Sequence, residues 1–546
     1  MRLATRIVCF GFAVAFSLFG AGLRPSCLGQ DAQRPNFIVI SIDDLGYADI
    51  GPFGSTINQT PNLDRMAAEG RKLTCFYAAP VCSPSRSALM TGCYPKRVLP
   101  IPGVLFPGAA VGVNPEEVTV AEVLKSAGYK TACIGKWHLG DQAPFLPTAQ
   151  GFDYYLGIPY SNDMGTAAEG SKSDLGAPIP QATNSPEKKA STNTQPADET
   201  GLRGNQQPSL PLVENTRVIG KVAQDQQQAI VATYTNAAVK FLKENKDQSF
   251  FLYLPHNAVH FPLYPGKDWV GKSGKGLYSD WISEVDDSVG TILNTVRDLG
   301  IDHRTLILFT SDNGGTQRAV NKPLRGFKGS TWEGGMRVPT IVRWPGVIPP
   351  GTSSDAITGM LDVLPTFASL AGTPLDKTRR IDGIDLSRVL RDEPGAAGHE
   401  TFYFYLGLNL QAVRQGKWKL IPGTPAAPAP ATAQAAGKEA EKEAGSKATG
   451  QADAKSAKKK ANKKNAAAKA ETPAGPQLYD LESDLSESKN VADAHPEIVA
   501  ALMKLVEQAD DDLGRTGKGP GVRPLGRVAN PEPFIRTDGT IRDDAR

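Results

Sequence analysis

Short apolar runs without polar alternation recur along the chain. The first, at residues 36–42, reads Asn-Phe-Ile-Val-Ile-Ser-Ile and is followed by two aspartates. Such a run is typical of a strand that is buried on both faces of a parallel sheet. Similar runs, which we interpret as further strands, lie at residues 130–134, 249–254, 304–309 and 338–343.

Helix-type patterns lie between these runs. Residues 62–69 and 116–127 each follow a polar residue and a proline, a common start of a helix, and a longer pattern covers 226–244. Because strands alternate with helices, the chain is predicted to be an α/β protein with a mostly parallel sheet covered on both faces. Ligands bind such sheets beyond the carboxyl ends of the strands, so polar residues that follow a strand are the first candidates for a site.

Two stretches interrupt this alternation. Residues 166–210 are rich in Ser, Pro, Gly, Asn and Gln, and we interpret them as a long surface insertion. Residues 422–476 consist almost entirely of Ala, Lys, Pro and Glu, which favours a solvated loop; the alternative is a basic segment that binds an anionic polymer or surface. On either side of this second insertion, residues 412–421 and 478–481 are predicted to be neighbouring strands of a small C-terminal sheet.

The N-terminus has the order of segments found in a secretory signal. Basic residues come first, an apolar run follows at 7–19, and small and polar residues lie near position 30. We therefore expect residues 1–30 to direct export to the periplasm or the outside and then to be removed. A membrane anchor is the alternative, but the run is shorter than the ~20 residues of a spanning helix, so no stable membrane span is expected.

Charge and cysteine content exclude some classes of function. The 546 residues carry a net charge of only +3, which gives no electrostatic reason to expect nucleic acid as a partner. Cys9 and Cys27 belong to the predicted signal, and the remaining four cysteines are too few for a disulfide scaffold. One disulfide among these four stays open: Cys75, Cys82, Cys93 and Cys133.

Carboxylates follow two of the predicted strands. Asp43 and Asp44 end the run at 36–42, and Asp312 with Asn313 ends the run at 304–309. Both sets are expected at the same carboxyl edge. Two carboxylates ~4 Å apart repel by roughly 4 kcal/mol at an effective dielectric of 20, so a cluster of three requires a cation. Because all these ligands are oxygens, they favour Ca²⁺ or Mg²⁺ over Zn²⁺.

Cationic and histidine side chains follow two other predicted strands. Lys136 and His138 lie in Gly-Lys-Trp-His-Leu-Gly, directly after the run at 130–134. His256 and His260 follow the run at 249–254, and the pattern alone does not choose between them. Taken alone, the Gly-Lys-Trp-His-Leu-Gly block is about as typical of a loop with a positive charge and a hydrogen-bonded structural histidine as it is of a functional site.

The most informative segment is Cys82-Ser-Pro-Ser-Arg86, with Thr91-Gly92 downstream. Proline near the start and good helix formers behind it place Cys82 at a helix N-terminus, where the backbone dipole favours negative charge. This segment resembles the signature of the type I sulfatases, in which a separate enzyme oxidises the cysteine to Cα-formylglycine. The Gly-Lys-Trp-His-Leu-Gly block closely resembles a block of the same family. Phe-Leu-Pro, followed by Gly-Phe and then by Gly-Ile-Pro-Tyr-Ser, which ends at Ser161, resembles arylsulfatase A and the galactosamine-6-sulfatases within it.

The resemblance implies a mechanism for sulfate ester hydrolysis. One hydroxyl of the hydrated aldehyde attacks sulfur, and the other later expels sulfate, which avoids a slowly hydrolysed serine or cysteine sulfate ester. Arg86, at i+4, is expected to hold the formylglycine oxygens. The metal, taken as Ca²⁺ with Mg²⁺ as the alternative, is expected to be bound by Asp43, Asp44, Asp312, Asn313 and the modified Cys82.

The resemblance also assigns the sulfate contacts. Lys136 and His138 are implied to contact the sulfate and the formylglycine, and Lys328, in Gly-Phe-Lys-Gly-Ser-Thr-Trp-Glu-Gly-Gly, to bind the sulfate together with His260. The Ser161 hydroxyl is implied to contact the metal site or the sulfate, and a structural turn serine is the alternative. His260 is preferred to His256 because the family's catalytic histidine precedes an aromatic-proline pair. His260 or Lys328 would protonate the leaving alcohol, and His138 would assist the elimination step.

The family further implies an alkaline-phosphatase-like mixed sheet with a small C-terminal antiparallel sheet and a helix. We accordingly expect a signal at 1–30, a catalytic domain at 31–400, a C-terminal subdomain at 401–510 and a tail at 511–546. The alternatives are a phosphomonoester or phosphonate hydrolase of the same superfamily, and a non-catalytic protein that binds sulfated glycans. The sequence leaves open whether the sulfate ester is of an aryl, glycan or glycolipid alcohol.

Overall fold

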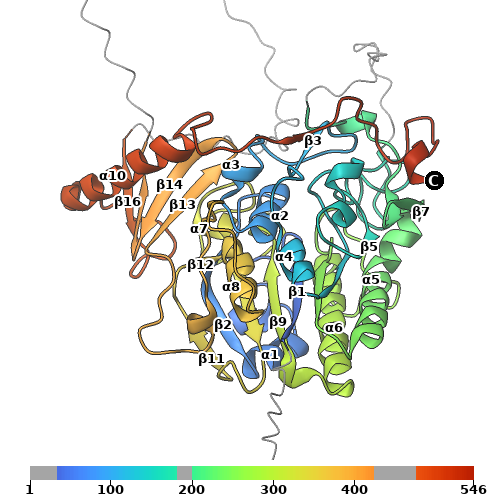
Figure 1. Ribbon diagram of the computed structural model, residues 1–546, viewed down its shortest axis with the longest axis horizontal. Helices are drawn as coiled ribbons and strands as arrows, with labels where there is room; N and C mark the ends of the chain where they lie inside the picture. Colours follow the sequence, from blue (N-terminus) through green and yellow to red (C-terminus); the bar gives the residue numbers. More distant parts are fainter. Residues whose placement is uncertain (1–33, 181–198, 424–474) are drawn as a thin grey trace, which may run out of the picture. The chain divides into compact units, whose positions relative to one another are not determined.

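The apolar runs form the middle of an 11-stranded sheet in the computed structural model (Figure 1). The structure describes residues 34–180, 199–423 and 475–546, and Arg34–Arg546 forms one unit. The predicted signal, the middle of the first insertion and most of the second lie outside the described residues. The strand order is β11-β2-β10-β9-β1-β8-β4-β5-β6-β7, with β12 beside β2.

Parallel pairing holds the centre of this sheet together. β1 pairs in parallel with β8 and β9, β4 does so with β8 and β5, and β10 is antiparallel to its neighbours. The strands of the main sheet are β1 Asn36–Ile42, β2 Arg71–Tyr77, β4 Lys130–Ile134, β5 Tyr154–Gly157, β6 Pro211–Glu214, β7 Arg217–Lys221, β8 Phe250–Pro255, β9 Thr305–Ser311, β10 Arg337–Arg343, β11 Thr352–Ser354 and β12 Thr358–Gly359.

Helices cover both faces of the sheet because both faces are apolar. Phe37 and Val39 of β1 pack in one hydrophobic cluster with α2, α4 and α8, while Ile38 and Ile40 pack in a second with α1, α5 and α6. Figure 1 shows α5 and α6 side by side. The helices are α1 Pro61–Ala68, α2 Cys82–Thr91, α3 Pro95–Val98, α4 Val120–Ser126, α5 Gln224–Asn245, α6 Leu277–Asp298, α7 Glu333–Met336, α8 Val363–Leu370, α9 Ser387–Leu390 and α10 Pro496–Leu513.

One predicted helix begins later than its sequence pattern suggested. Residues 116–127 were expected to be helical, but α4 begins at Val120, after Thr119. The Thr119 hydroxyl accepts from the Glu122 amide at 3.2 Å, and the Glu122 carboxylate accepts from the Thr119 amide at 2.7 Å. This capping box satisfies amides that would otherwise lack partners, so it fixes the start of the helix.

A four-stranded antiparallel sheet with α10 forms the C-terminal part. Its strands, in order, are β13 Thr401–Leu406, β14 Asn409–Gln415, β15 Trp418–Ile421 and β16 Gln477–Asp480. The single strand expected at 412–421 was wrong, because this segment turns at Gly416, whose φ of 54° suits glycine, and forms the β14–β15 hairpin. β15 does pair with β16 across the second insertion, as predicted.

The residues after α10 pack against the main part of the chain. β17 Gly526–Arg527 pairs with β3 Val111–Gly112, and Phe534 and Ile535 are fully buried. Both described flanks of the 166–210 stretch also contain buried residues, among them Ser171 and Leu210, and Leu210 packs in the second hydrophobic cluster. These flanks therefore belong to the packed unit, in contrast to the expected surface insertion.

Two further expectations concern thiols and membrane spans. Cys75, Cys82, Cys93 and Cys133 are free thiols, so no disulfide joins the described cysteines. In the described part of the chain, no helix has both the length and the apolar character needed to cross a bilayer.

Candidate active site

The predicted carboxylates meet at the carboxyl edge of the two central strands. Asp43 and Asp44 follow β1, and Asp312 and Asn313 follow β9, which is hydrogen-bonded to β1 along its length. The Asp312 amide donates to the Ile42 carbonyl at 2.9 Å, and the Asp44 amide donates to Asp312 Oδ1 at 3.4 Å. Parallel register therefore brings together groups that are some 270 residues apart in sequence.

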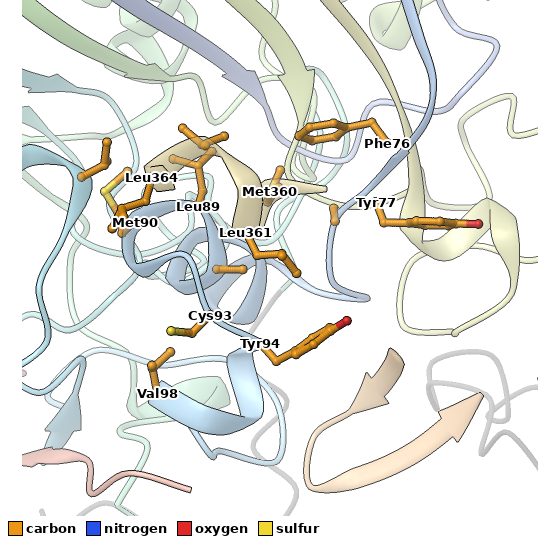
Figure 2. Packing of buried hydrophobic residues seen from close by; sticks show 14 of the residues in the cluster. Phe76, Tyr77, Leu89, Met90, Cys93, Tyr94, Val98, Met360, Leu361 and Leu364 are labelled. Atoms are coloured by element: carbon orange, nitrogen blue, oxygen red, sulfur yellow. The ribbon is translucent and has the colours of Figure 1, made fainter. Parts of the chain in front are cut away.

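Helix α2 presents Cys82 at its first position. All ten residues of α2 are buried, and Figure 2 shows Leu89 and Met90 packed near Met360, Leu361 and Leu364. A helix embedded in this way has little freedom to move its N-terminus. The Cys82 thiol lies 3.5 Å from Asp43 Oδ1, to which it donates, and it accepts from Lys328 Nζ at 3.3 Å.

Arg86, one turn along α2, holds Asp312. Its Nε and Nη2 donate to Asp312 Oδ2 at 3.1 and 2.8 Å, and Nη2 also lies 3.5 Å from Asp43 Oδ2. Nη1 donates to the Lys136 carbonyl. Arg86 thus joins α2 to the loops after β1, β9 and β4. Its predicted hold on the formylglycine oxygens stays a prediction, because residue 82 is an unmodified cysteine here.

Lys136, Ser161 and His260 form a connected row beside Asp43. Lys136 Nζ forms a buried ion pair with Asp43 Oδ2 and donates to Ser161 Oγ at 3.2 Å. Ser161 Oγ lies 3.2 Å from His260 Nδ1, which also contacts the Phe261 carbonyl. Because a carbonyl only accepts, Nδ1 carries a hydrogen, and Nε2 faces Asp44 Oδ2 at 3.7 Å.

Lys328 closes the other side of the cluster. Its Nζ lies 2.6 Å from Asp44 Oδ1, and burial, which would lower its pKa, is outweighed by the Asp44 carboxylate, so the pKa is raised. Its backbone amide donates to the Gly315 carbonyl, and the next amide donates to the Pro80 carbonyl, just before α2. The loop that carries Lys328 is therefore tied to both the β9 loop and the Cys82 helix.

The three histidines named from the sequence have different surroundings. His138 is buried, its Nε2 donates to the Leu105 carbonyl at 2.8 Å, and its Nδ1 has no partner among the described residues. Burial, with Lys136 and Arg86 nearby, holds the pKa of His138 well below its usual range. His256 lies outside the cluster: its Nε2 contacts Ser288 Oγ at 3.3 Å, and burial lowers its pKa to about 4. Of the two alternatives after β8, His260 is the one that joins the carboxylates.

The charges and oxygens of the cluster fit a divalent cation. Three carboxylates already face three cationic side chains, so an added cation would leave a positive excess for an anionic ligand to balance. Asn313 Nδ2 donates to Asp44 Oδ1 at 2.7 Å, while the buried Asn313 Oδ1 has no partner among the described residues. Ligand atoms of Asp43, Asp44, Cys82 and His260 all lie within 4.8 Å of one another. Hard oxygens in this number suit Ca²⁺ or Mg²⁺.

Burial and neighbouring charge act oppositely on the carboxylates. Burial alone would raise the pKa of Asp43, but Lys136, His260 and Lys328 outweigh it and hold that pKa well below its usual range. For Asp312, burial together with the Asp43 charge raises the pKa despite Arg86. A cation bound between these carboxylates would favour the ionised form of both.

Comparison with known proteins decides the family. Residues 35–373 match the family model described as sulfatase, and residues 397–518 match that of the C-terminal region of aryl-sulfatase. The chain belongs to the sulfatase family.

Relatives of this sulfatase extend over most of its length. Human arylsulfatase A is 35% identical over 505 residues, which cover 87% of this chain and 87% of that protein. N-acetylgalactosamine-6-sulfatase from Sus scrofa is 34% identical over 410 residues, 71% of each protein. The crystal structure of Ps i-CgsB in complex with k-i-k-neocarrahexaose is 27% identical, has a TM-score of 0.64, and covers 87% of this chain and 92% of that chain. The sulfatase is therefore an enzyme that hydrolyses sulfate esters, and the expected alkaline-phosphatase-like fold is confirmed.

A buried ion network behind the sulfatase site was not predicted from the sequence. Lys419 of β15 lies 2.9 Å from Glu333 and 2.8 Å from Glu487, and it donates to the Thr331 carbonyl at 2.8 Å. The Glu487 carboxylate accepts from the Glu333 amide at 2.8 Å. Glu333 begins α7, five residues after Lys328, so the C-terminal sheet holds the end of the Lys328 loop. The one local sequence signal for this network is that a lysine, Lys419, stands among the apolar residues of a predicted strand.

Proposed function

We propose that this sulfatase cleaves its ester with the hydrate of a formylglycine made from Cys82, beside a bound Ca²⁺. The observation that carries the proposal is the placement of Cys82 at the buried start of α2, in contact with Asp43 and Lys328. As an aldehyde hydrate, this position would supply a hydroxyl to attack sulfur and a second whose deprotonation releases sulfate.

The residues proposed to hold the cation are Asp43, Asp44, Asp312, Asn313 and the modified Cys82. The orphaned Asn313 Oδ1 supports this set, as do the ligand atoms of Asp43, Asp44 and Cys82, which lie within 4.8 Å of one another. Asp312 joins them because its Oδ1 accepts from the Asp44 amide. When bound, the cation would act as a Lewis acid on a sulfate oxygen and favour the ionised nucleophile. Mg²⁺ is the alternative cation. Among the described residues, this is the one group of acidic, cysteine and histidine side chains that could hold a metal, so a phosphatase with two metal sites has no support.

The protein's own cations would bind the sulfate. Lys328 contacts the Cys82 thiol and Lys136 pairs with Asp43, so each places an ammonium in the cluster. One preorganised donor lowers a barrier by only ~3 to 4 kcal/mol, so several must act on the same group. Ser161 would orient both Lys136 and His260, because its hydroxyl contacts the two.

Proton transfer is assigned to the histidines and Lys328. His260 Nε2 faces the cluster, while Nδ1 keeps its hydrogen against Ser161 and the Phe261 carbonyl. With a second proton on Nε2, the imidazolium would give that proton to the leaving alcohol and return to the neutral form with a hydrogen on Nδ1; Lys328 is the alternative acid. His138 would assist the elimination step as a base, because it is neutral and its Nδ1 is unpartnered among the described residues.

The substrate is proposed to be a sulfate ester of an aryl, glycan or glycolipid alcohol. One relative is named for N-acetylgalactosamine 6-sulfate and a structural neighbour was solved with a hexaose, which favours a sugar. Export through the signal at 1–30 would bring the enzyme to such substrates. Cys82 is only 2% exposed, so the maturation enzyme would reach it before the chain has folded.

Release of 4-nitrophenol from 4-nitrophenyl sulfate tests the proposal. The purified wild type is expected to turn over, and Cys82→Ala is expected to lose nearly all activity because it provides no hydroxyl. 4-Nitrophenyl phosphate serves as the matched ester and is expected to react far more slowly. Preference for the phosphate, or sulfate binding without turnover, would favour the phosphatase or the glycan-binding alternative.

A further inference from the structure

A loop at residues 315–321 lies beside the open side of the cluster. Lys328 and His260 have side chains that are 18% and 11% exposed, whereas Asp43, Arg86 and Lys136 are almost fully buried. Solvent therefore reaches the cluster past Lys328 and His260. The loop is fixed there, since Gly315 accepts from the Lys328 amide at 3.0 Å and Val320 accepts from the Ala48 amide at 2.8 Å.

Arg318 is the cationic side chain that this loop presents. Its side chain is 42% exposed, and its guanidinium lies 5.2 Å from the ring centroid of Phe261, the residue after His260. Nη1 donates to Asp174 Oδ2 at 2.8 Å. Asp174 is itself anchored, because its Oδ1 accepts from the Leu263 amide at 2.8 Å. The guanidinium is thus held in place next to the His260 segment while part of it stays in water.

We propose that Arg318 binds a second anionic group, a carboxylate or a sulfate, on the leaving-group part of the substrate. The proposal rests on the proposed function, since it places the leaving group beside His260. A partly exposed ion pair such as that of Arg318 with Asp174 contributes little to the stability of the fold. A guanidinium already oriented by a ring and a carboxylate loses little entropy on binding and suits a planar carboxylate or a sulfate.

The reacting sulfate does not need Arg318. Lys328 donates to Cys82 Sγ, and Lys136 pairs with Asp43. Among the described residues, Arg318 forms no hydrogen bond or ion pair with these lysines or with the carboxylates of the cluster. Its contacts are with Asp174, which lies in the flank of the first insertion, and with Phe261. Arg318 is therefore placed to select substrates rather than to act on the sulfur.

A matched series of nitrophenyl sulfates tests this inference. The ring would be unsubstituted, or carry a carboxylate, a sulfonate standing in for a second sulfate, or a neutral carboxamide. For wild type we expect kcat/KM to be about 10-fold to 100-fold higher for an anionic ring than for the carboxamide. Arg318→Gln should lose this preference mainly through KM and leave the unsubstituted ester within about twofold. The carboxylate and sulfonate arms separate the two anion sources.

Arg297→Gln is the control. Arg297 is 47% exposed and pairs with one carboxylate, that of Glu69, but it lies at the end of α6. This variant should keep the wild-type preference. Asp174→Asn removes the carboxylate that holds Arg318 but leaves the Arg318 charge in place. This variant should keep part of the preference for an anionic ring.

The two proposals fail in different ways. If wild type cleaves the unsubstituted ester but does not prefer an anionic ring, the Arg318 inference is overturned while the proposed function stands. Equal losses of kcat/KM on all four esters in Arg318→Gln would also overturn the inference, because a residue that only stabilises the loop would have that effect. Absence of turnover on every ester by wild type would overturn both.

Discussion

The two histidines after β8 show how strongly the surroundings of a side chain decide its use. His260 lies against Ser161 and 3.7 Å from Asp44, whereas His256, four residues earlier, packs near Tyr234 and contacts Ser288. Both belong to one short segment, so local sequence alone could not separate them. The choice between them depends on which side of the chain faces the carboxylates.

His260→Ala should lower kcat/KM for an alkyl sulfate by about 10²- to 10⁴-fold, the usual contribution of a general acid. An activated aryl sulfate, whose leaving group needs little protonation, should lose much less. His256→Ala is the matched control and should keep activity within a few-fold while lowering the melting temperature, because it leaves a buried cavity. Equal losses of His260→Ala on the alkyl and aryl esters would exclude His260 as the leaving-group acid.

Glu284 of α6 makes stability depend on pH. Burial raises the pKa of Glu284 to about 7, although the Gly266 amide donates to it at 2.7 Å. Between the unfolded pKa near 4.5 and the folded value, the native state holds a proton that the unfolded chain has released, so this group lowers stability as pH rises. Glu284→Gln should therefore be more stable than wild type at pH 8 by roughly 1–3 kcal/mol and nearly equal at pH 4.5. Urea unfolding at both pH values checks this; a constant difference would contradict it.

At the scale of elements, the strands could be predicted because strands buried on both faces of a parallel sheet have continuous apolar sequences. All five runs are strands within a residue or two of the expected bounds. The hairpin at 412–421 could not be read from the apolar pattern, because a single glycine, Gly416, makes the turn between two strands of similar composition. The carboxylates and Cys82 could be placed from sequence because each follows or begins an element. The Lys419 network could not, since its partners are 86 and 68 residues away and no local pattern joins them.

Lys419→Met should be strongly destabilising, by about 3–5 kcal/mol, because it leaves Glu333 and Glu487 buried without their cation. Activity should also fall at temperatures where the protein is still folded, because the Lys328 loop loses its anchor at α7. Chemical unfolding and ester turnover measured on the same samples check both effects.

Lys417→Met is the control for this change, since Lys417 lies two residues away, is 43% exposed and pairs with Asp480. Its effect should stay below about 1 kcal/mol. Similar losses for the two variants would mean that the buried network does not support the site.

At the scale of the whole molecule, the C-terminal sheet and the residues after α10 support the part of the chain that carries the site. The catalytic cluster depends on loops from the main sheet, and the C-terminal sheet and the residues after α10 pack against that part. A cation bound by Asp43, Asp44 and Asp312 would therefore stabilise the complete fold, because it binds the native state alone.

Removal of the cation should lower both stability and activity. Dialysis against a chelator is expected to decrease the melting temperature and abolish ester turnover, and added Ca²⁺ should restore both, with Mg²⁺ less effective. Asp312→Asn, which removes one ligand charge, should weaken the response to Ca²⁺. A melting temperature that does not depend on chelator or Ca²⁺ would contradict the proposed metal site.

Mass spectrometry of the tryptic peptide from Leu73 to Arg86, from active enzyme made in its native host, tests the central claim most directly. The peptide contains two cysteines, Cys75 and Cys82, so alkylation before digestion supplies an internal standard. We predict one alkylated thiol, at Cys75, and an aldehyde at position 82 that reacts with a hydrazide. Two alkylated thiols in fully active enzyme would contradict the formylglycine mechanism.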